Sequence, residues 1–341
     1  MRRLLCLCAL VAVVPTLSCA TGPAGATDSA SSAPLRWRPT QRLAQVLDLA
    51  GPRADGRLLV AAAGRLYLLG PGRGLRPFAR GPHGYSTALG PEPYIALSRG
   101  QRVPGAGCAF PLDAAYALEP GSRPGVIRID ASGHAQRVVN LPGLGMANGI
   151  TFDTVGRFGG RLLITTSKDG RTTVEALDCR SRLSKITGTA PRVEGGIAVA
   201  PPTFGRFAGD LIAPDEVTGR ILAIDPNGRV QFVVNSSIAH GPDIGVESLG
   251  FVPPTFRGAE LAYLADRRVP GNPHPGDDRL LALSAAAMKG VGVRPGDLLA
   301  VGEGGAATID VRCKRACRVR HIANGPAISH AEGHMAFATG R

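Results

Sequence analysis

The sequence predicts an all-β protein of the β-propeller class, with six blades preferred over five. Three observations lead to this class. A short phrase recurs about every 40 to 60 residues along most of the chain, a spacing typical of propellers and solenoids. Further strand patterns recur behind it in the same order, and helix-type periodicity is nearly absent, with one turn or two expected over Leu281 to Lys289.

The recurring phrase consists of a polar residue, one or two small or turn residues and a short apolar run. Its copies are Glu92-Pro-Tyr-Ile-Ala-Leu, Asn148-Gly-Ile-Thr-Phe, Glu194-Gly-Gly-Ile-Ala-Val, Glu247-Ser-Leu-Gly-Phe-Val and Glu332-Gly-His-Met-Ala-Phe. Short apolar runs bounded by turn residues indicate strands. We expect the phrase to form the innermost strand of each blade.

Two more strand types, and in places a third, follow the phrase. One is represented by Gly156-Arg-Phe-Gly-Gly-Arg-Leu-Leu-Ile and Gly205-Arg-Phe-Ala-Gly-Asp-Leu-Ile-Ala, and the next by Gly125-Val-Ile-Arg-Ile-Asp and Gly219-Arg-Ile-Leu-Ala-Ile-Asp. Four strands per unit, repeated around a centre, describe a propeller blade. A β-sandwich of many short strands is the alternative.

The two ends of the chain predict how the ring closes. Arg57 to Arg80 supplies three strands and lacks a first one, whereas Glu332 to Ala338 is a first strand with nothing behind it. We expect the C-terminal strand to join this N-terminal blade. A shorter sixth blade is expected over Gly290 to Gly325.

The N-terminus has the pattern of an export signal, with Arg2-Arg3 before an apolar run that is too short to span a bilayer. We expect a signal peptide over residues 1–26, or a lipoprotein signal ending at residue 18 with a lipid anchor on Cys19. Residues 27–40 are expected to be a flexible linker, and residues 41–341 the propeller domain. The protein would then be secreted or held at the cell surface.

Four cysteines remain outside the signal, at positions 108, 179, 313 and 317. In an oxidising compartment they indicate two disulfides, with three possible pairings. The close spacing of Cys313 and Cys317 would suit a tight hairpin and leave Cys108 for Cys179. A zinc site is the alternative, although the spacing is not that of a zinc knuckle.

The formal net charge of +13 does not by itself indicate nucleic-acid binding. Nearly all of the 39 basic residues are arginines, and these are scattered along the chain. We expect no nucleic-acid partner and a monomer. The expected ligand is a small lactone or ester, or a molecule at the cell surface.

The polar heads of the repeated phrase are the candidate metal ligands. If the phrase is the innermost strand, these heads meet near the central axis, where several carboxylates would repel one another unless a cation compensates. Carboxylate and carboxamide oxygens suit a hard cation, calcium before other divalent ions. The alternative is that these acids cap strand ends or pair with arginines. The candidates are Glu92, Asn148, Glu194, Glu247 and Glu332.

The blade from Val193 to Val234 resembles the senescence-marker/gluconolactonase family of six-bladed, calcium-dependent lactone hydrolases. The resemblance rests on Glu194-Gly-Gly-Ile-Ala-Val, on Gly219-Arg-Ile-Leu-Ala-Ile-Asp, and on Asn148-Gly149, which matches the family's Asn-Gly ligand. Glu194-Gly195 stands where the family has Asp-Gly. The resemblance implies calcium, lactone or ester hydrolysis, and Glu194 as the base that takes a proton from water.

The C-terminal phrase adds two histidines. His330, Glu332 and His334 alternate, so that on a regular strand all three face one side. They could bind a transition metal, or His334 could carry protons in catalysis. Asp215-Glu216 and Asp243 are expected in loops that could line the mouth, with plain surface acids as the alternative. A binding propeller without catalysis is the second hypothesis, because one fold hosts many functions.

Overall fold

The computed structural model describes residues 33–70, 74–79, 92–142 and 145–339, and about half of these lie in strands. The described residues contain one α-helix, α1 (Ala285–Gly290), and two 3-10 turns, Pro104–Ala106 and Gly205–Phe207. None of the described helices is long and apolar enough to cross a membrane. The expected all-β class is confirmed, while the expected export signal and Cys19 lie outside the described residues.

Four sheets have four antiparallel strands each, taken in chain order from the inside outward. The first two contain β3 (Val46–Ala50), β4 (Leu58–Ala62), β5 (Arg65–Leu69) and β6 (Leu75–Pro77), then β7 (Ile95–Leu97), β10 (Ala115–Glu119), β11 (Gly125–Ile129) and β12 (Ala135–Asn140). The next two contain β13 (Met146–Phe152), β14 (Leu162–Lys168), β15 (Arg171–Leu177) and β16 (Leu183–Pro191), then β17 (Ala198–Val199), β18 (Leu211–Asp215), β19 (Arg220–Ile224) and β20 (Val230–Asn235). A short hairpin, β8 (Arg102–Val103) with β9 (Cys108–Ala109), lies between β7 and β10.

A nine-stranded sheet contains the remaining strands in the order β1-β26-β25-β24-β21-β27-β22-β23-β2. Their bounds are β1 (Leu35–Arg36), β2 (Arg38–Arg42), β21 (Val246–Phe251), β22 (Glu260–Asp266), β23 (Arg279–Ser284), β24 (Leu298–Gly302), β25 (Thr308–Cys313), β26 (Cys317–Asn324) and β27 (Ala331–Thr339). Strands β21 and β27 are joined by a single parallel pair, Leu249 with His334.

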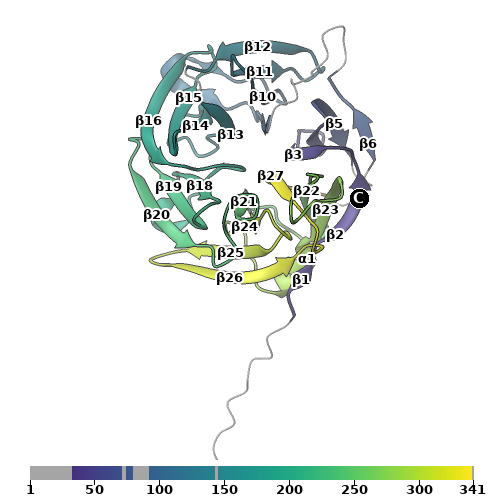
Figure 1. Ribbon diagram of the computed structural model, residues 1–341. Coiled ribbons are helices and arrows are strands. Elements are labelled where there is room, and N and C mark those ends of the chain that lie inside the picture. Colours follow the sequence, from purple (N-terminus) through teal and green to yellow (C-terminus); the bar gives the residue numbers. More distant parts are fainter. Residues whose placement is uncertain (1–32, 71–73, 80–91, 143–144, 340–341) are drawn as a thin grey trace, which may run out of the picture. The chain divides into compact units, whose positions relative to one another are not determined.

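These sheets have a propeller-like arrangement around a common centre (Figure 1). The innermost strands contact one another in the order β3, β7, β13, β17, β21, β27 and back to β3. The described residues form six clusters of buried apolar side chains, each between two successive groups of strands. Apolar burial between neighbouring sheets is therefore what holds the ring together.

Two expected strand groupings are wrong. Strand β27 does not complete the sheet over Arg57 to Arg80, because β3 (Val46–Ala50) is the first strand there. Strand β27 pairs with β22 instead, in a sheet whose outer strand is β2. Behind β21 lie β24 to β26, within the expected short sixth blade, while β22 and β23, which follow β21 in the chain, belong with β27.

The first strands begin closer to the N-terminus than expected. Residues 35–42, placed partly in a linker, form β1 and β2. Trp37 is buried between them, and its Nε1 donates a hydrogen bond of 2.7 Å to Thr308 Oγ1. An indole buried with its N–H satisfied explains why this polar segment joins the sheet.

Both expected disulfides are present. One joins Cys108 to Cys179 across 71 residues, and the other joins Cys313 to Cys317. The short one closes the turn between β25 and β26, as the spacing predicted.

Candidate functional site at the start of the inner strands

Glycines let the starts of the inner strands approach closely. Gly195 has φ of 81°, and a Cβ atom there would stand 2.3 Å from Glu247 Oε1. The amide of Gly195 donates to the carbonyl of Asn148, and the amide of Gly196 to that of Glu247, both at 3.0 Å. Only glycine accepts this conformation and contact without strain. The polar heads beside these glycines therefore share a narrow space.

Tyr94 links two of the predicted acids. Its hydroxyl lies 2.7 Å from Glu247 Oε1 and 2.8 Å from Glu332 Oε2. All three side chains are buried. A hydroxyl has one proton to donate, so the second contact needs a proton on a carboxyl group. Burial, followed by the charges of Glu92 and Glu332, raises the pKa of Glu247, which makes it the acid that donates.

A second group surrounds the other side of Glu332. His330 Nε2 lies 2.7 Å from Glu303 Oε1 and 3.4 Å from Glu332 Oε1, and Arg267 Nη1 donates to Glu332 Oε1 at 3.1 Å. Burial opposes a charge on His330, but the hydrogen bonds to Glu303 and Glu332 outweigh it and raise its pKa to about 10. Burial likewise opposes ionisation of Glu332, but His330 and Arg267 lower its pKa.

Glu92 has fewer compensating contacts than the other acids. Its Oε2 atom is buried and has no hydrogen-bond partner among the residues that the structure describes. Burial first, then the charges of Glu332 and Glu194, raise its pKa well above the ordinary value. A buried carboxylate oxygen without a donor is costly unless something neutralises it. Glu92 therefore adds an unpaired carboxylate oxygen to the negative charges of Glu332 and Glu194.

Glu194 and Asn148 have partners of their own. Arg192 Nε donates to Glu194 Oε2 at 2.9 Å, and its Nη2 contacts the same oxygen. Asn148 Nδ2 donates to the carbonyl of Val193 and to Ser167 Oγ, both at 2.9 Å, while its Oδ1 accepts from Thr165. The structure thus brings Glu92, Glu247 and Glu332 together and places Glu194 at their edge. The Asn148 amide belongs to a neighbouring hydrogen-bond network instead.

Two sets of side chains could hold a metal ion among the described residues. Glu303, His330 and Glu332 form one, and Glu216, Asp243 and Glu303 the other, with ligand atoms within 4.8 Å of one another in each. Burial, then repulsion from Glu303 and Glu194, raises the pKa of Glu216 to about 7. Carboxylates outnumber the cationic groups here, and the unpaired Glu92 oxygen adds to the excess. The residues present fit a divalent cation.

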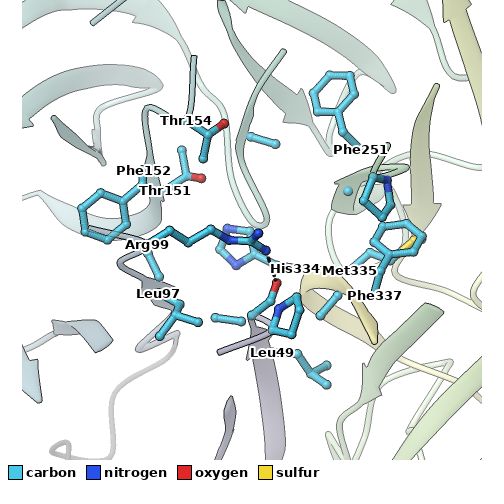
Figure 2. A pocket seen from close by; sticks show the side chains of 18 of the residues that line it. Leu49, Leu97, Arg99, Thr151, Phe152, Thr154, Phe251, His334, Met335 and Phe337 are labelled. Atoms are coloured by element: carbon cyan, nitrogen blue, oxygen red, sulfur yellow. Dashed lines mark hydrogen bonds between the residues drawn. The ribbon is translucent and has the colours of Figure 1, made fainter. Parts of the chain in front are cut away.

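His334 lies apart from this cluster. Gly333 has φ of 65°, which breaks the strand alternation, so His330, Glu332 and His334 do not share one face as expected. His334 Nδ1 lies 3.0 and 3.1 Å from the two oxygens of Asp48, and the Tyr94 ring packs edge-on against the imidazole at 6.3 Å between centroids. Burial opposes a charge on His334, but Asp48 outweighs it and raises its pKa. The histidine lies on the floor of a separate pocket, shown in Figure 2.

Sequence reasoning missed several residues of the acid cluster and of the neighbouring His334 site. Asp48 was passed over because its strand, Val46 to Ala50, lacks the polar head and turn of the repeated phrase. Glu303 and Arg267 were missed as well, although each follows the second strand of its sheet as Glu216 does. That shared position after the second strand was the available signal.

Comparisons with known proteins give only distant likenesses. No protein-family model and no curated protein matches the chain. A virginiamycin B lyase from Staphylococcus aureus aligns over 89% of this chain and 96% of its own, with 11% identity and a TM-score of 0.47. A protein assigned as TolB from Agrobacterium tumefaciens aligns over 88% and 91%, with 12% identity and a TM-score of 0.47. A protein assigned as a gluconolactonase aligns over 73% and 91%, with 15% identity and a TM-score of 0.36. The TM-scores of these three structures lie below 0.5, so they carry no argument about chemistry or strand count.

Proposed function

We propose that the chain is a six-bladed propeller related to the senescence-marker/gluconolactonase proteins. The nine-stranded sheet divides into two blades at the single Leu249–His334 pair, with β21, β24, β25 and β26 in one and β27, β22, β23 and β2 in the other. The closed cycle of six inner strands supports this count. The last blade then combines the C-terminal strand with β2 from the N-terminal segment and closes the ring.

We propose that the acid cluster binds one divalent cation, with calcium as the first candidate. Glu92, Glu303 and Glu332 would supply oxygen ligands, with His330 beside them. Glu247 would remain hydrogen-bonded to Tyr94. The observation that carries this proposal is the buried, unpaired Glu92 oxygen among carboxylates that interact repulsively. Oxygen donors favour calcium, whereas His330 Nε2 would suit a transition metal, so the ion is to be measured.

The proposed reaction is hydrolysis of a lactone or ester. A divalent cation held by the acid cluster would polarise the substrate carbonyl. Glu194 would take a proton from the attacking water, and its ion pair with Arg192 holds the carboxylate in place. The water oxygen would bond to the carbonyl carbon, the carbon–oxygen ester bond would break, and Glu194 would pass its proton to the leaving oxygen. His334 has no part in this step because it lies beyond Tyr94 from the acids.

Export remains part of the proposal. Two disulfides are typical of an oxidising compartment, which agrees with a protein that carries an N-terminal export signal. We propose a secreted protein, or one held at the membrane through a lipid on Cys19. Mass spectrometry of the mature N-terminus distinguishes cleavage near residue 26 from a lipidated Cys19.

The reaction is tested with a panel of lactones and esters, with and without chelator, on the purified full chain. Elemental analysis of the same preparation identifies the ion. We expect chelator-sensitive hydrolysis that Glu194→Gln reduces at least about a hundredfold, the lower range for losing a general base. Glu175→Gln is the matched control, since Glu175 is also buried with an unpaired Oε2 but lies on β15.

A binding propeller is the second candidate, and one observation favours it. Glu194 and Glu332 already have cationic partners, which a purely structural or ligand-presenting cluster would also show. A tightly bound ion without hydrolysis of any panel member would support this function and contradict the hydrolase.

A further inference from the structure

The opposite ends of the inner strands enclose a second site. The acids stand at the starts of these strands, whereas the later residues of all six line a cavity of about 340 Å³. Figure 2 shows Phe152, Phe251, Met335 and Phe337 around this space, with His334 at its floor. Tyr94 separates the two sites, because its hydroxyl binds the acids and its ring packs on His334.

Most side chains in the walls of this cavity are apolar, while backbone groups and a few polar side chains make up about half of its exposed surface. The apolar side chains come from Leu49, Leu97, Phe152, Phe251, Met335 and Phe337 together with smaller aliphatic residues. At about 30 Å³ for each water-sized unit, the space has room for roughly ten non-hydrogen atoms. Concave sites of this size with apolar walls and a few polar groups are typical of small-molecule pockets. The ligand therefore has an apolar body of about that size.

The polar groups of the lining indicate the ligand's head group. Arg99, at the end of β7, is exposed, and its Nη2 donates to the Gly51 carbonyl at 3.1 Å. Among the described residues it has no carboxylate partner, and four of its five N–H donors are unused. Glu260, the one acidic residue of the lining, accepts the Arg257 amide at 2.7 Å. That amide is neutral, so Glu260 keeps its own charge, and Arg99 is the group of the lining whose free N–H donors can pair with an anion.

The floor adds one more unused donor or acceptor. His334 is fixed through Nδ1 by Asp48, which also accepts the backbone amides of Leu49, Ile95 and His334. Its Nε2 atom is buried and has no geometric hydrogen bond within the described part of the chain, although the backbone of Ile150 and Ile197 lies near the ring. A pocket with a rigid polar floor, apolar walls and a guanidinium near its opening suits an amphipathic anion.

We propose that this pocket binds a small apolar monocarboxylate, of the class of medium-chain fatty acids, with the carboxylate at Arg99. An arginine guanidinium pairs with a carboxylate through two parallel hydrogen bonds, which explains the choice of acid over alcohol or amine. The site is independent of the acid cluster and of any hydrolytic activity there.

Calorimetric titration of the full chain with octanoate, and with octan-1-ol as the neutral match, tests the proposal. We expect saturable octanoate binding that Arg99→Gln weakens at least tenfold, with less than a twofold effect on octan-1-ol. Ala198→Phe, which fills the cavity from β17, should abolish binding of both. Thr154→Trp, on the exposed loop at the opening, repeats this test without touching a strand.

Two controls separate this site from the proposed cation site. Glu92→Gln and added chelator should leave octanoate binding unchanged, even if they abolish hydrolysis. Absence of saturable octanoate binding overturns the proposal, as does binding that survives both Ala198→Phe and Thr154→Trp. Equal loss of octanoate and octan-1-ol in Arg99→Gln would contradict the assignment of the head group.

Discussion

At the scale of single residues, the candidate site depends on glycines that no side chain could replace. Gly195 and Gly271 both have positive φ, 81° and 91°, but only Gly195 meets neighbours where its Cβ would stand. Gly271 would meet nothing within 4 Å. The pair therefore separates the cost of the backbone conformation from the cost of crowding Glu247.

We predict that Gly195→Ala destabilises the protein more than Gly271→Ala. A left-handed conformation costs a non-glycine residue about 1–2 kcal/mol, and this applies to both variants. Crowding of Glu247 should add about 1–3 kcal/mol to Gly195→Ala alone. Denaturant unfolding of both variants measures the difference. Equal losses would show that the inner strands are further apart than described.

Asp210 gives a prediction about pH. Burial, only partly offset by Arg157 at 3.9 Å, raises its pKa from 3.8 to about 6. The folded protein then binds more protons than the unfolded chain between these values, so this group lowers stability as pH rises through that window. Asp210→Asn should leave the free energy of unfolding unchanged near pH 4 and raise it by about 1 kcal/mol at pH 7, after allowance for solvent screening. Unfolding curves at both pH values check this, and a less stable variant at pH 7 would contradict it.

The candidate site could be predicted from the sequence only in part. The repeated phrase identified Glu92, Glu247 and Glu332, because a polar head before each inner strand is a local pattern. Asp48, Glu303 and Arg267 enter the same region from other positions, and their approach depends on how the strands are arranged in space. The bulge at Gly333, which turns His334 toward Asp48, could not be read from alternation alone.

At the scale of elements, the strands were easier to predict than their partners. Val46 to Ala50 aside, the apolar runs and turn residues located most strands of the ring. Pairing failed for β22 and β23, which follow β21 directly but belong with β27. The local sequence pattern predicts that a segment is a strand. Which strand it pairs with depends on burial against strands that are distant in the sequence.

The two disulfides should differ in what they contribute to stability. Cys108–Cys179 spans 71 residues and Cys313–Cys317 spans 4. Loop-closure entropy then predicts a loss of about 4 kcal/mol when the first is removed and about 2 kcal/mol for the second. Double cysteine-to-serine variants of each pair, unfolded by denaturant, provide the comparison. A larger loss for the short loop would contradict an entropic origin.

At the scale of the whole molecule, ring closure brings together distant parts of the sequence. Strand β27 near the C-terminus and β2 near the N-terminus lie in one sheet on either side of β22 and β23, and Trp37 reaches Thr308. The same closure brings Glu332 and His330 to Glu92, Glu247 and Glu303. Both the proposed cation site and its separation from the proposed carboxylate pocket therefore depend on this closure.

The central claim is that the starts of the inner strands hold one divalent cation. Calorimetric titration of chelator-treated protein with calcium, magnesium, manganese and zinc tests it most directly, with Glu92→Gln as the site variant and Glu175→Gln as the buried control. We predict saturable binding of one ion per chain, weakened at least tenfold in Glu92→Gln and unchanged in Glu175→Gln. Absence of saturable binding for all four ions, or binding that Glu92→Gln leaves unaltered, would contradict the claim.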